Sequence, residues 1–313
     1  MNLQAIFIRE EIIKTVRSFF FEKKFHEVIT PVLNRALPLE PNLYAFTTSW
    51  NTLKRKEELY LATSPESGLK KMVAQGIGNC FAIGKSFRNL EDTSRQHNPE
   101  FLMLEWYREN ADYNQIMAEV QELIIFVKKR VDLFLKRKFS PEIIYQDQKI
   151  NLIGDWPKIS LEDLFLKYAS QKLKNIKEDD FYKIFLNEIE KHLPKTPFFL
   201  IGFPSIISPL CTPRKDKPYL AERFELYFFG MEIGNGNTEN TDTKAIQKVF
   251  LTEEKIRKNK KKVSPVIDKD FLEALTKIRQ LADQYAGIGL GIDRLAMIMA
   301  NASDIKQVEP FFV

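Results

Sequence analysis

The stretch from Phe81 to Tyr107 carries residue types that could bind a nucleotide and an amine. It reads FAIGKSFRNLEDTSRQHNPEFLMLEWY, two alternating runs around a polar loop, which predicts an antiparallel hairpin. Because strand side chains alternate between faces, small residues and Arg88 share one face with Phe101 and Glu105. A guanidinium, a carboxylate and aromatic rings over small residues suit a ligand with a flat ring, phosphates and an amine. The alternative is an ordinary strand pair with a solvated face.

A second pair of runs, RFELYFFGMEIGNG, also predicts a hairpin. A two-residue turn at 229–230 would pair Glu225 with Gly234 and Tyr227 with Glu232. Both carboxylates would then share a face, where they repel unless a cation lies between them. Mg²⁺ binds one or two carboxylates together with phosphate oxygens, so the pattern indicates a site for Mg²⁺ with ATP. Two unrelated strand acids are the alternative.

Two further strings begin helices. In SPESGLKKMV we expect Ser64 as the N-cap and Pro65 in the first position. Glu66 then interacts favourably with the helix dipole. In AGIGLGIDRLAMIMA a glycine-rich strand leads into a helix with Asp293 and Arg294 at its start, and glycine lets a substrate approach the backbone closely. A dinucleotide-binding motif is excluded, because no βαβ unit with a downstream ribose acid surrounds these glycines.

These strings resemble the motifs of the class II aminoacyl-tRNA synthetases, in the lysyl branch. RNLEDTSRQHNPEF followed by LEWY resembles motif 2, KKFHEVITPVL resembles motif 1, and GxGxGxDRL resembles motif 3. HNPEF with LEWY is most similar to the short lysyl-tRNA synthetase-like ligases that modify elongation factor P. The resemblance covers about residues 5–115 and 200–310.

The resemblance implies that lysine or β-lysine is activated by ATP and Mg²⁺ as an aminoacyl adenylate. Arg88 and Arg294 are the catalytic residues it implies, on the α-phosphate with the incoming carboxylate and on the γ-phosphate. The residues implied for ATP are Arg88, Glu91, Arg95, His97, Phe101 and Arg294. Those implied for the amino acid are Glu66, Glu105, Tyr107, Asn235, Glu239 and Gly289. Those implied for Mg²⁺ are Glu225 and Glu232.

The sequence departs from the family pattern at three points. RNLE stands where RNE is usual, so we place the adenine-side glutamate at Glu91. Asn237 stands where an aromatic ring packs on the alkyl chain of the substrate. Gly289 stands where the protein-modifying branch often has Ala and the tRNA-charging branch has Gly. The choice between α-lysine and β-lysine therefore stays open.

The acceptor of the activated amino acid is a separate question. Motif 1 begins almost at Met1, which leaves no room for the N-terminal anticodon-binding barrel of lysyl-tRNA synthetases. We therefore expect a lysine side chain of elongation factor P as the acceptor. The enzymatic alternative is a truncated paralogue that charges tRNA or another acceptor. The basic helix at 251–262 would suit a tRNA. A catalytically dead paralogue that only binds a partner is the non-enzymatic alternative.

The elements that position these motifs follow from periodicity. We expect an α+β (α/β) protein with the class II synthetase catalytic fold, a mostly antiparallel sheet flanked by helices, in one domain over residues 1–313. The expected helices span 4–24, 111–137 and 251–262, with a helical insertion over 140–200. The expected short strands are 28–29 and 60–63, with a loop over 31–46. We expect a homodimer formed through motif 1.

Composition is compatible with this interpretation. The chain has 313 residues, 44% of them hydrophobic, and a net charge of +5, which permits an acidic partner or nucleic acid without requiring either. Cys80 and Cys211 provide no disulfide framework and no metal-ligand spacing, which favours a reducing cytoplasm. No apolar run approaches the roughly 20 residues of a membrane span, so no membrane association is expected.

Overall fold

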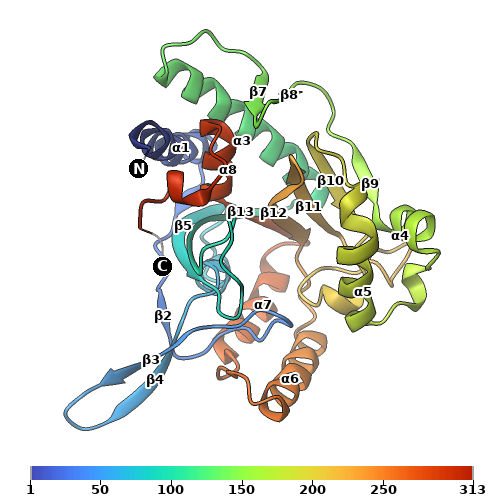
Figure 1. The fold of residues 1–313 in the computed structure, drawn as a ribbon. Coiled ribbons are helices and arrows are strands. Elements are labelled where there is room, and N and C mark those ends of the chain that lie inside the picture. The colour runs from blue at the N-terminus through green and yellow to red at the C-terminus, as the bar shows by residue number, and fades with distance from the viewer. Residues whose placement is uncertain (1, 312–313) are drawn as a thin grey trace.

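An eight-stranded sheet forms the centre of the computed structural model, which describes residues 2–311 (Figure 1). In order across the sheet, the strands are β1 (His26–Glu27), β5 (Cys80–Phe87), β6 (Glu100–Glu109), β13 (Tyr285–Gly291), β12 (Met231–Thr238), β11 (Arg223–Phe228), β10 (Phe198–Ile201) and β9 (Lys158–Ser160). Neighbouring strands are antiparallel except for the pairs β1–β5 and β9–β10. The expected mostly antiparallel sheet flanked by helices is confirmed.

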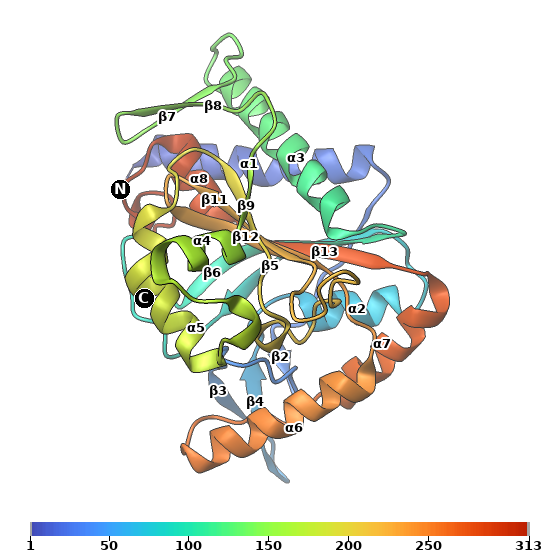
Figure 2. The ribbon, with the colours of Figure 1, turned by 90° about the vertical axis from the view of Figure 1, so that its right-hand side faces the viewer.

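Helices cover both faces of this sheet. On one face lie α1 (Leu3–Glu22), α3 (Tyr113–Phe134) and α8 (Ile292–Ala300), drawn above the sheet in Figure 1. On the other side lie α2 (Glu66–Val73), α6 (Thr243–Asn259) and α7 (Lys269–Leu281). Figure 2 shows α4 (Leu161–Ala169) and α5 (Glu178–Ile184) beside the β9–β10 edge. Within residues 2–311, no helix is both long and apolar enough to cross a membrane.

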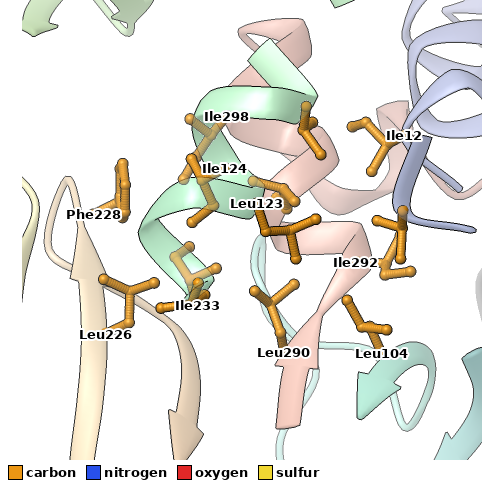
Figure 3. Close-up of a cluster of buried hydrophobic side chains, with 14 of the residues drawn as sticks. Ile12, Leu104, Leu123, Ile124, Leu226, Phe228, Ile233, Leu290, Ile292 and Ile298 are labelled. Carbon is orange, nitrogen blue, oxygen red and sulfur yellow. The ribbon is translucent and has the colours of Figure 1, made fainter. Parts of the chain in front are cut away.

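The main hydrophobic core fills the space between the sheet and the first helix layer. Ile12 of α1, Leu123 of α3 and Ile298 of α8 point toward Leu104 and Leu290 on the strands (Figure 3). Each of these side chains is at most 1% exposed. Burying one such side chain contributes about 1.5–3 kcal/mol to the stability of the fold. This layer therefore holds in place the strands that carry the site.

The hairpin expected between Phe81 and Tyr107 is present as β5 and β6. Its register pairs Ala82 with Glu105, Gly84 with Met103 and Ser86 with Phe101. Small residues of β5 therefore lie beside the large and charged residues of β6 on one face. Leu104 and Trp106 of β6 face the core instead, as the alternation predicts.

The second hairpin, β11–β12, corrects one expected pair. Tyr227 pairs with Glu232, as expected, but Glu225 pairs with Asn235 rather than with Gly234. The reason is a register shift between Leu226 and Tyr227, a β-bulge that inserts one residue into the pairing. The two-residue turn itself lies at 229–230, where both residues have positive φ values of 52° and 75°.

Several expected boundaries were wrong in the first third of the chain. β1 lies at 26–27 rather than 28–29, and the strand expected at 60–63 is the end of β4 (Lys56–Leu61). β4 pairs with β3 (Thr47–Asn51) in a projecting hairpin and with β2 (Leu33–Asn34), which lies inside the expected loop over 31–46. The residues of β3 are all exposed, so no alternation of buried and exposed positions marked the hairpin.

The segment 140–200 is only partly helical. Its helices are α4, α5 and the short turns η1 (Leu173–Asn175), η2 (Phe185–Ile189) and η3 (Glu190–His192), in agreement with the periodicity over 160–192. It also contains a hairpin of β7 (Glu142–Tyr145) and β8 (Gln148–Asn151), and β9 and β10 extend the main sheet. The expected helical insertion over 140–200 is therefore helical only in its middle part, with strands on either side. Two further short turns, η4 (Ser205–Ile207) and η5 (Ile305–Gln307), follow.

Candidate active site

Two adjoining cavities lie at the face of the sheet that carries the motif residues. The larger has a volume of ≈ 600 Å³ and the smaller a volume of ≈ 250 Å³. The residues that line both cavities are Arg88, Glu91, Met103, Asn235 and Gly289. The strands β5, β6, β12 and β13 thus bring segments from both halves of the chain to one junction.

Arg88 lies at this junction, at the end of β5. Its guanidinium carbon is 5.3 Å from the centroid of the Phe101 ring. Its buried Nε has no hydrogen-bond partner among residues 2–311. A buried donor without a partner is rare and costly, so this atom suits an anionic ligand that occupies either cavity.

The polar loop after β5 presents two of its three predicted ATP residues to the larger cavity. Leu90, the extra residue of the loop, is exposed and has a φ of 63°, so the insertion bulges outward. Glu91 then lines both cavities, and His97 lines the larger one. Arg95 is exposed and does not line either cavity, and its backbone oxygen accepts from the Ile305 amide at 2.8 Å.

The start of α8 closes the larger cavity. Arg294 donates from Nη1 to the backbone oxygen of Glu232 at 2.6 Å and from Nε to that of Gln96 at 3.3 Å. Its neighbour Asp293 is structural: it accepts from Arg9 at 2.7 Å and from the amide of Leu102 at 2.8 Å. The helix start is thereby tied to α1 and to β6, which fixes the Arg294 guanidinium in the cavity wall.

The two carboxylates predicted for Mg²⁺ are neighbours with different surroundings. Glu232 lines the larger cavity. Glu225 lies behind it, accepting from Arg223 at 2.8 Å and from the Tyr227 hydroxyl at 3.0 Å. Burial and the Glu232 carboxylate raise the pKa of Glu225 to about 7. These two carboxylates repel each other, and a divalent cation bound beside Glu232 would relieve that repulsion. Within residues 2–311 no three acidic, His or Cys side chains could hold a metal together, so such a cation would also need phosphate oxygens.

Of the carboxyl groups predicted for the amino acid, those of Glu66 and Glu105 line the smaller cavity, and Glu239 is a buried neighbour that does not line it. Glu105 accepts from the Tyr107 hydroxyl at 2.6 Å, and both side chains are 4% exposed. Glu239 accepts from the Asn237 amide at 3.0 Å, so Asn237 positions a carboxyl group where an aromatic ring was usual. Burial raises the pKa of Glu105 to about 8 and that of Glu239 to about 7, and the nearby Glu66 carboxylate adds to both shifts. Clustered buried carboxyl groups of this kind suit a cationic ligand.

The comparison with known proteins identifies the family. The family described as "tRNA synthetases class II (D, K and N)" matches residues 2–312. This chain belongs to the class II tRNA synthetases. The resemblance to this family seen in the sequence is therefore confirmed, and the candidate site lies where the segments that resemble motifs 2 and 3 meet.

Two groups of relatives are similar to this class II synthetase. The lysine–tRNA ligase of Saccharolobus solfataricus is 33% identical over 98% of this chain, which spans 64% of that ligase. The elongation factor P–(R)-β-lysine ligases of Buchnera aphidicola, from the subspecies Schizaphis graminum and Acyrthosiphon pisum, are 34% and 32% identical over 99% of this chain, which spans 96% and 95% of them. The family and these relatives support an adenylate-forming ligase.

Sequence analysis missed Lys70, which is only 1% exposed in this class II synthetase. Its ammonium contacts Glu66, one helical turn earlier in α2, and lies 2.6 Å from Glu239. It also lies 5.3 Å from the centroid of the Tyr107 ring. The spacing of Glu66 and Lys70, four residues apart on a helix, was a signal for the ion pair but not for its burial.

Sequence analysis also missed Glu40 and Arg223, which line the smaller cavity. Glu40 lies in a stretch without periodicity, so no pattern indicated it. The expected N-cap was displaced by one residue: Pro65 is the N-cap of α2, and the Ser64 hydroxyl accepts from the Glu66 amide at 3.2 Å.

Proposed function

We propose that this chain activates lysine or β-lysine with ATP and transfers it to a lysine side chain of elongation factor P. The observation that carries the proposal is that Arg88 lies between two cavities, a larger one that also holds Arg294 and a smaller one lined by Glu40, Glu66 and Glu105. A nucleotide in the first and a diammonium amino acid in the second would place their reacting groups beside one guanidinium.

The larger cavity suits ATP. Phe101 would stack on the adenine with Arg294 on the opposite face, since a guanidinium stacks well on a flat ring. Arg88 and His97 face the space where phosphates would lie, whereas Arg95 would have to turn inward to reach them. Mg²⁺, held by Glu232 with Glu225 behind it, would neutralise phosphate charge when bound.

The smaller cavity suits a lysine. Glu66 and Glu105 line this cavity and provide carboxylates for two ammonium groups, with the Tyr107 hydroxyl beside Glu105. Glu239 would add a third carboxylate next to them, through its ion pair with Lys70. Lys70 satisfies part of this negative charge when the cavity is empty. Asn235 and Gly289 line both cavities, so they would contact the part of the substrate that crosses the junction.

The chemistry follows from charge. The amino-acid carboxylate attacks the α-phosphorus in line, and pyrophosphate leaves. Both reactants are anions, so fixed cations must offset their repulsion and stabilise the developing charge. Arg88 lines both cavities and would contact both reactants at once. An amine of the acceptor then attacks the carbonyl of the adenylate, and an amide forms as AMP leaves.

The proposed acceptor is elongation factor P. Support comes from two relatives named as ligases of this factor, which align over 96% and 95% of their own length. Charging of tRNA is the second candidate. It is favoured by the similarity to lysine–tRNA ligases and by Gly289, although this chain spans only 64% of the first of those relatives. The active-site residues suit both acceptors, because an amine and a ribose hydroxyl attack the same carbonyl.

The deciding experiment incubates the protein with ATP, Mg²⁺ and labelled α- or β-lysine, and with either purified elongation factor P or total tRNA. We expect a mass increase on elongation factor P. Label on tRNA alone would refute the proposed acceptor and leave the adenylate chemistry standing. Failure to bind ATP in a calorimetric titration would favour a protein that only binds a partner.

We also propose a homodimer formed through motif 1, in the cytoplasm. Apolar side chains of the motif 1 region are exposed, namely Leu3, Phe7, Phe21, Ile29, Val32 and Leu33. Exposed apolar side chains on this part of the chain would be covered in a dimer. Cys80 and Cys211 are buried free thiols, which suit a reducing compartment.

A further inference from the structure

Glu40 is a fourth carboxyl group at the amino-acid cavity, on the loop before β3. It lines the smaller cavity together with Glu66 and Arg88. Burial and the neighbouring Glu66 carboxylate raise the pKa of its carboxyl group. Two neighbouring carboxyl groups repel when both are ionised, so one of them keeps its proton or a cation binds beside them.

The carboxyl groups around the cavity differ in the side chains that lie beside them. Glu105 and Glu239 lie beside Tyr107 and Lys70. Glu40 and Glu66 form a pair, and Glu40 interacts with the Arg88 guanidinium as well as with Lys70. Since Arg88 is the residue that would hold the reacting carboxylate, the Glu40–Glu66 pair lies at the reacting end of the amino acid.

The buried Lys70 ammonium does not neutralise both carboxyl groups of the Glu40–Glu66 pair. Lys70 forms ion pairs with Glu66 and Glu239. Within residues 2–311, the carboxyl groups of Glu40 and Glu105 form no ion pair with any side chain. Burial and the Glu66 carboxylate raise the pKa of Glu40 to about 8, against the opposing effects of Lys70 and Arg88. Two carboxyl groups that line the cavity therefore have no cationic partner of their own, and a diammonium substrate has one amine for each.

Glu40 is held in place from outside the cavity. Arg257 of α6, which is 1% exposed, donates to the backbone oxygens of Glu40 at 2.5 Å and Leu43 at 3.0 Å. Its own charge is met by Glu253 at 2.6 Å. Lys262 donates to the Tyr44 hydroxyl at 2.9 Å. The basic run 251–262 is therefore not simply solvated, because part of it fixes the loop that carries Glu40.

We propose that Glu40 is an amine-binding residue, which together with Glu66 holds the ammonium group nearest the reacting carboxylate of the amino acid. This inference rests on the proposed function. It adds a specificity-determining residue: Glu40 would select for an amine at the α- or β-carbon, while Glu105 and Glu239 select for the distal amine. The Glu40 backbone is held by Arg257, so Glu40→Gln removes the charge and leaves the loop anchored.

The test compares Glu40→Gln, Glu40→Asp and the control Glu188→Gln, a surface residue of η2. Pyrophosphate exchange is measured with the better of α- and β-lysine, and 6-aminohexanoate, which has only the distal amine, is the competitive inhibitor. For Glu40→Gln we expect kcat/KM for lysine to fall about 10- to 100-fold, the loss of one hydrogen bond to a charged group. The inhibition constant of 6-aminohexanoate should stay within twofold, and Glu40→Asp should recover part of the loss.

Two results would overturn the role of Glu40. One is an unchanged kcat/KM for lysine in Glu40→Gln. The other is an equal loss for lysine and for 6-aminohexanoate, which would indicate a general effect on the cavity. A wild-type protein that supports no exchange with any amino acid would contradict the proposed function instead. Calorimetric titration of lysine into wild type and Glu40→Gln would then still test whether Glu40 binds the amine.

Discussion

Arg294 and His97 are joined by a hydrogen bond in the wall of the larger cavity, with 2.6 Å between Nη2 and Nε2. A guanidinium only donates, so Nε2 must accept, and the ring is neutral with its proton on Nδ1. That proton is donated to the Ser94 hydroxyl oxygen, 2.8 Å from Nδ1. Burial and the Arg294 charge both lower the pKa of His97, which agrees with a neutral ring.

The first prediction concerns the charge of His97. A triphosphate beside His97 would favour the imidazolium, so ATP with Mg²⁺ should raise the pKa of His97. The measurement is an NMR titration of the histidine Cε1 protons with and without ATP. The chain has three histidines, and His26 and His192 are exposed, so their signals serve as internal controls. A His97 pKa that does not move with ATP would contradict phosphate binding at this wall.

The second prediction concerns the two cavity arginines. Arg88→Ala and Arg294→Ala should each lower the rate of lysine-dependent pyrophosphate exchange by about 10²–10³, the cost of one electrostatic group in a transition state. Arg88→Lys should recover little, because an ammonium lacks the planar fork of donors. Arg279→Ala on the exposed side of α7 is the control and should keep full activity. Normal exchange in both cavity variants, with unchanged unfolding curves, would rule out the assignment of the site.

The third prediction concerns the pH dependence of stability without amino acid. The pKa of Glu105 is about 8 in the folded protein, against an ordinary value of 4.5. A raised pKa means that the folded state keeps its proton longer, so stability is full below pH 4.5 and is lost as pH rises toward 8. In Glu105→Gln the free energy of unfolding should fall less steeply with rising pH, by up to ~1.4 kcal/mol per pH unit.

Thermal unfolding of wild type, Glu105→Gln and the surface control Glu188→Gln between about pH 5 and 8.5 measures this effect. Adding lysine should also flatten the wild-type curve, because bound ammonium groups favour the ionised carboxylates. Parallel curves for wild type and Glu105→Gln would show that Glu105 ionises normally and would contradict the prediction.

The fourth prediction concerns the junction glycine. A Cβ at Gly289 would lie 3.4 Å from the Met103 sulfur, an ordinary contact, so Gly289→Ala should fold. Its methyl group would narrow the junction where the α- and β-carbons of the substrate lie. We expect the ratio of kcat/KM for α- and β-lysine to change about tenfold or more.

Gly287→Ala is the contrasting variant for this prediction. A Cβ there would lie 2.5 Å from Cδ1 of Tyr107, too close to be accommodated without movement. It should lower stability and activity with both amino acids. If the two alanine variants behave alike, the effect at Gly289 comes from general disruption and not from substrate choice.

The fifth prediction concerns the dimer. Phe7 on α1 is 49% exposed, and Phe7→Glu should shift the protein to monomers if α1 forms the interface. Sedimentation equilibrium at micromolar concentration measures the change. Leu186→Glu on η2, also an exposed apolar position, is the control and should leave the association unchanged. A wild-type protein that sediments only as a monomer would remove the proposed dimer.

The sequence by itself determined the local arrangement of the motif residues. Alternation placed Phe101, Glu105 and Tyr107 on one face of a strand, and the structure has them there, because the period of two is a property of extended backbone. The sequence likewise predicted that Arg294 lies in the first turn of a helix, because a glycine-rich strand is followed by an apolar helical pattern. The family resemblance added roles that no periodicity could supply.

Only the tertiary structure decided which residues meet across long separations. The β-bulge pairs Glu225 with Asn235 instead of Gly234, a register that turn length alone does not set. Lys70 and Glu40 carry no pattern of their own. Lys70 is buried because α7 covers its helix, and Glu40 reaches the cavity because Arg257, more than 200 residues later, holds its loop. Contacts of this kind arise from packing, and packing is settled by the whole fold.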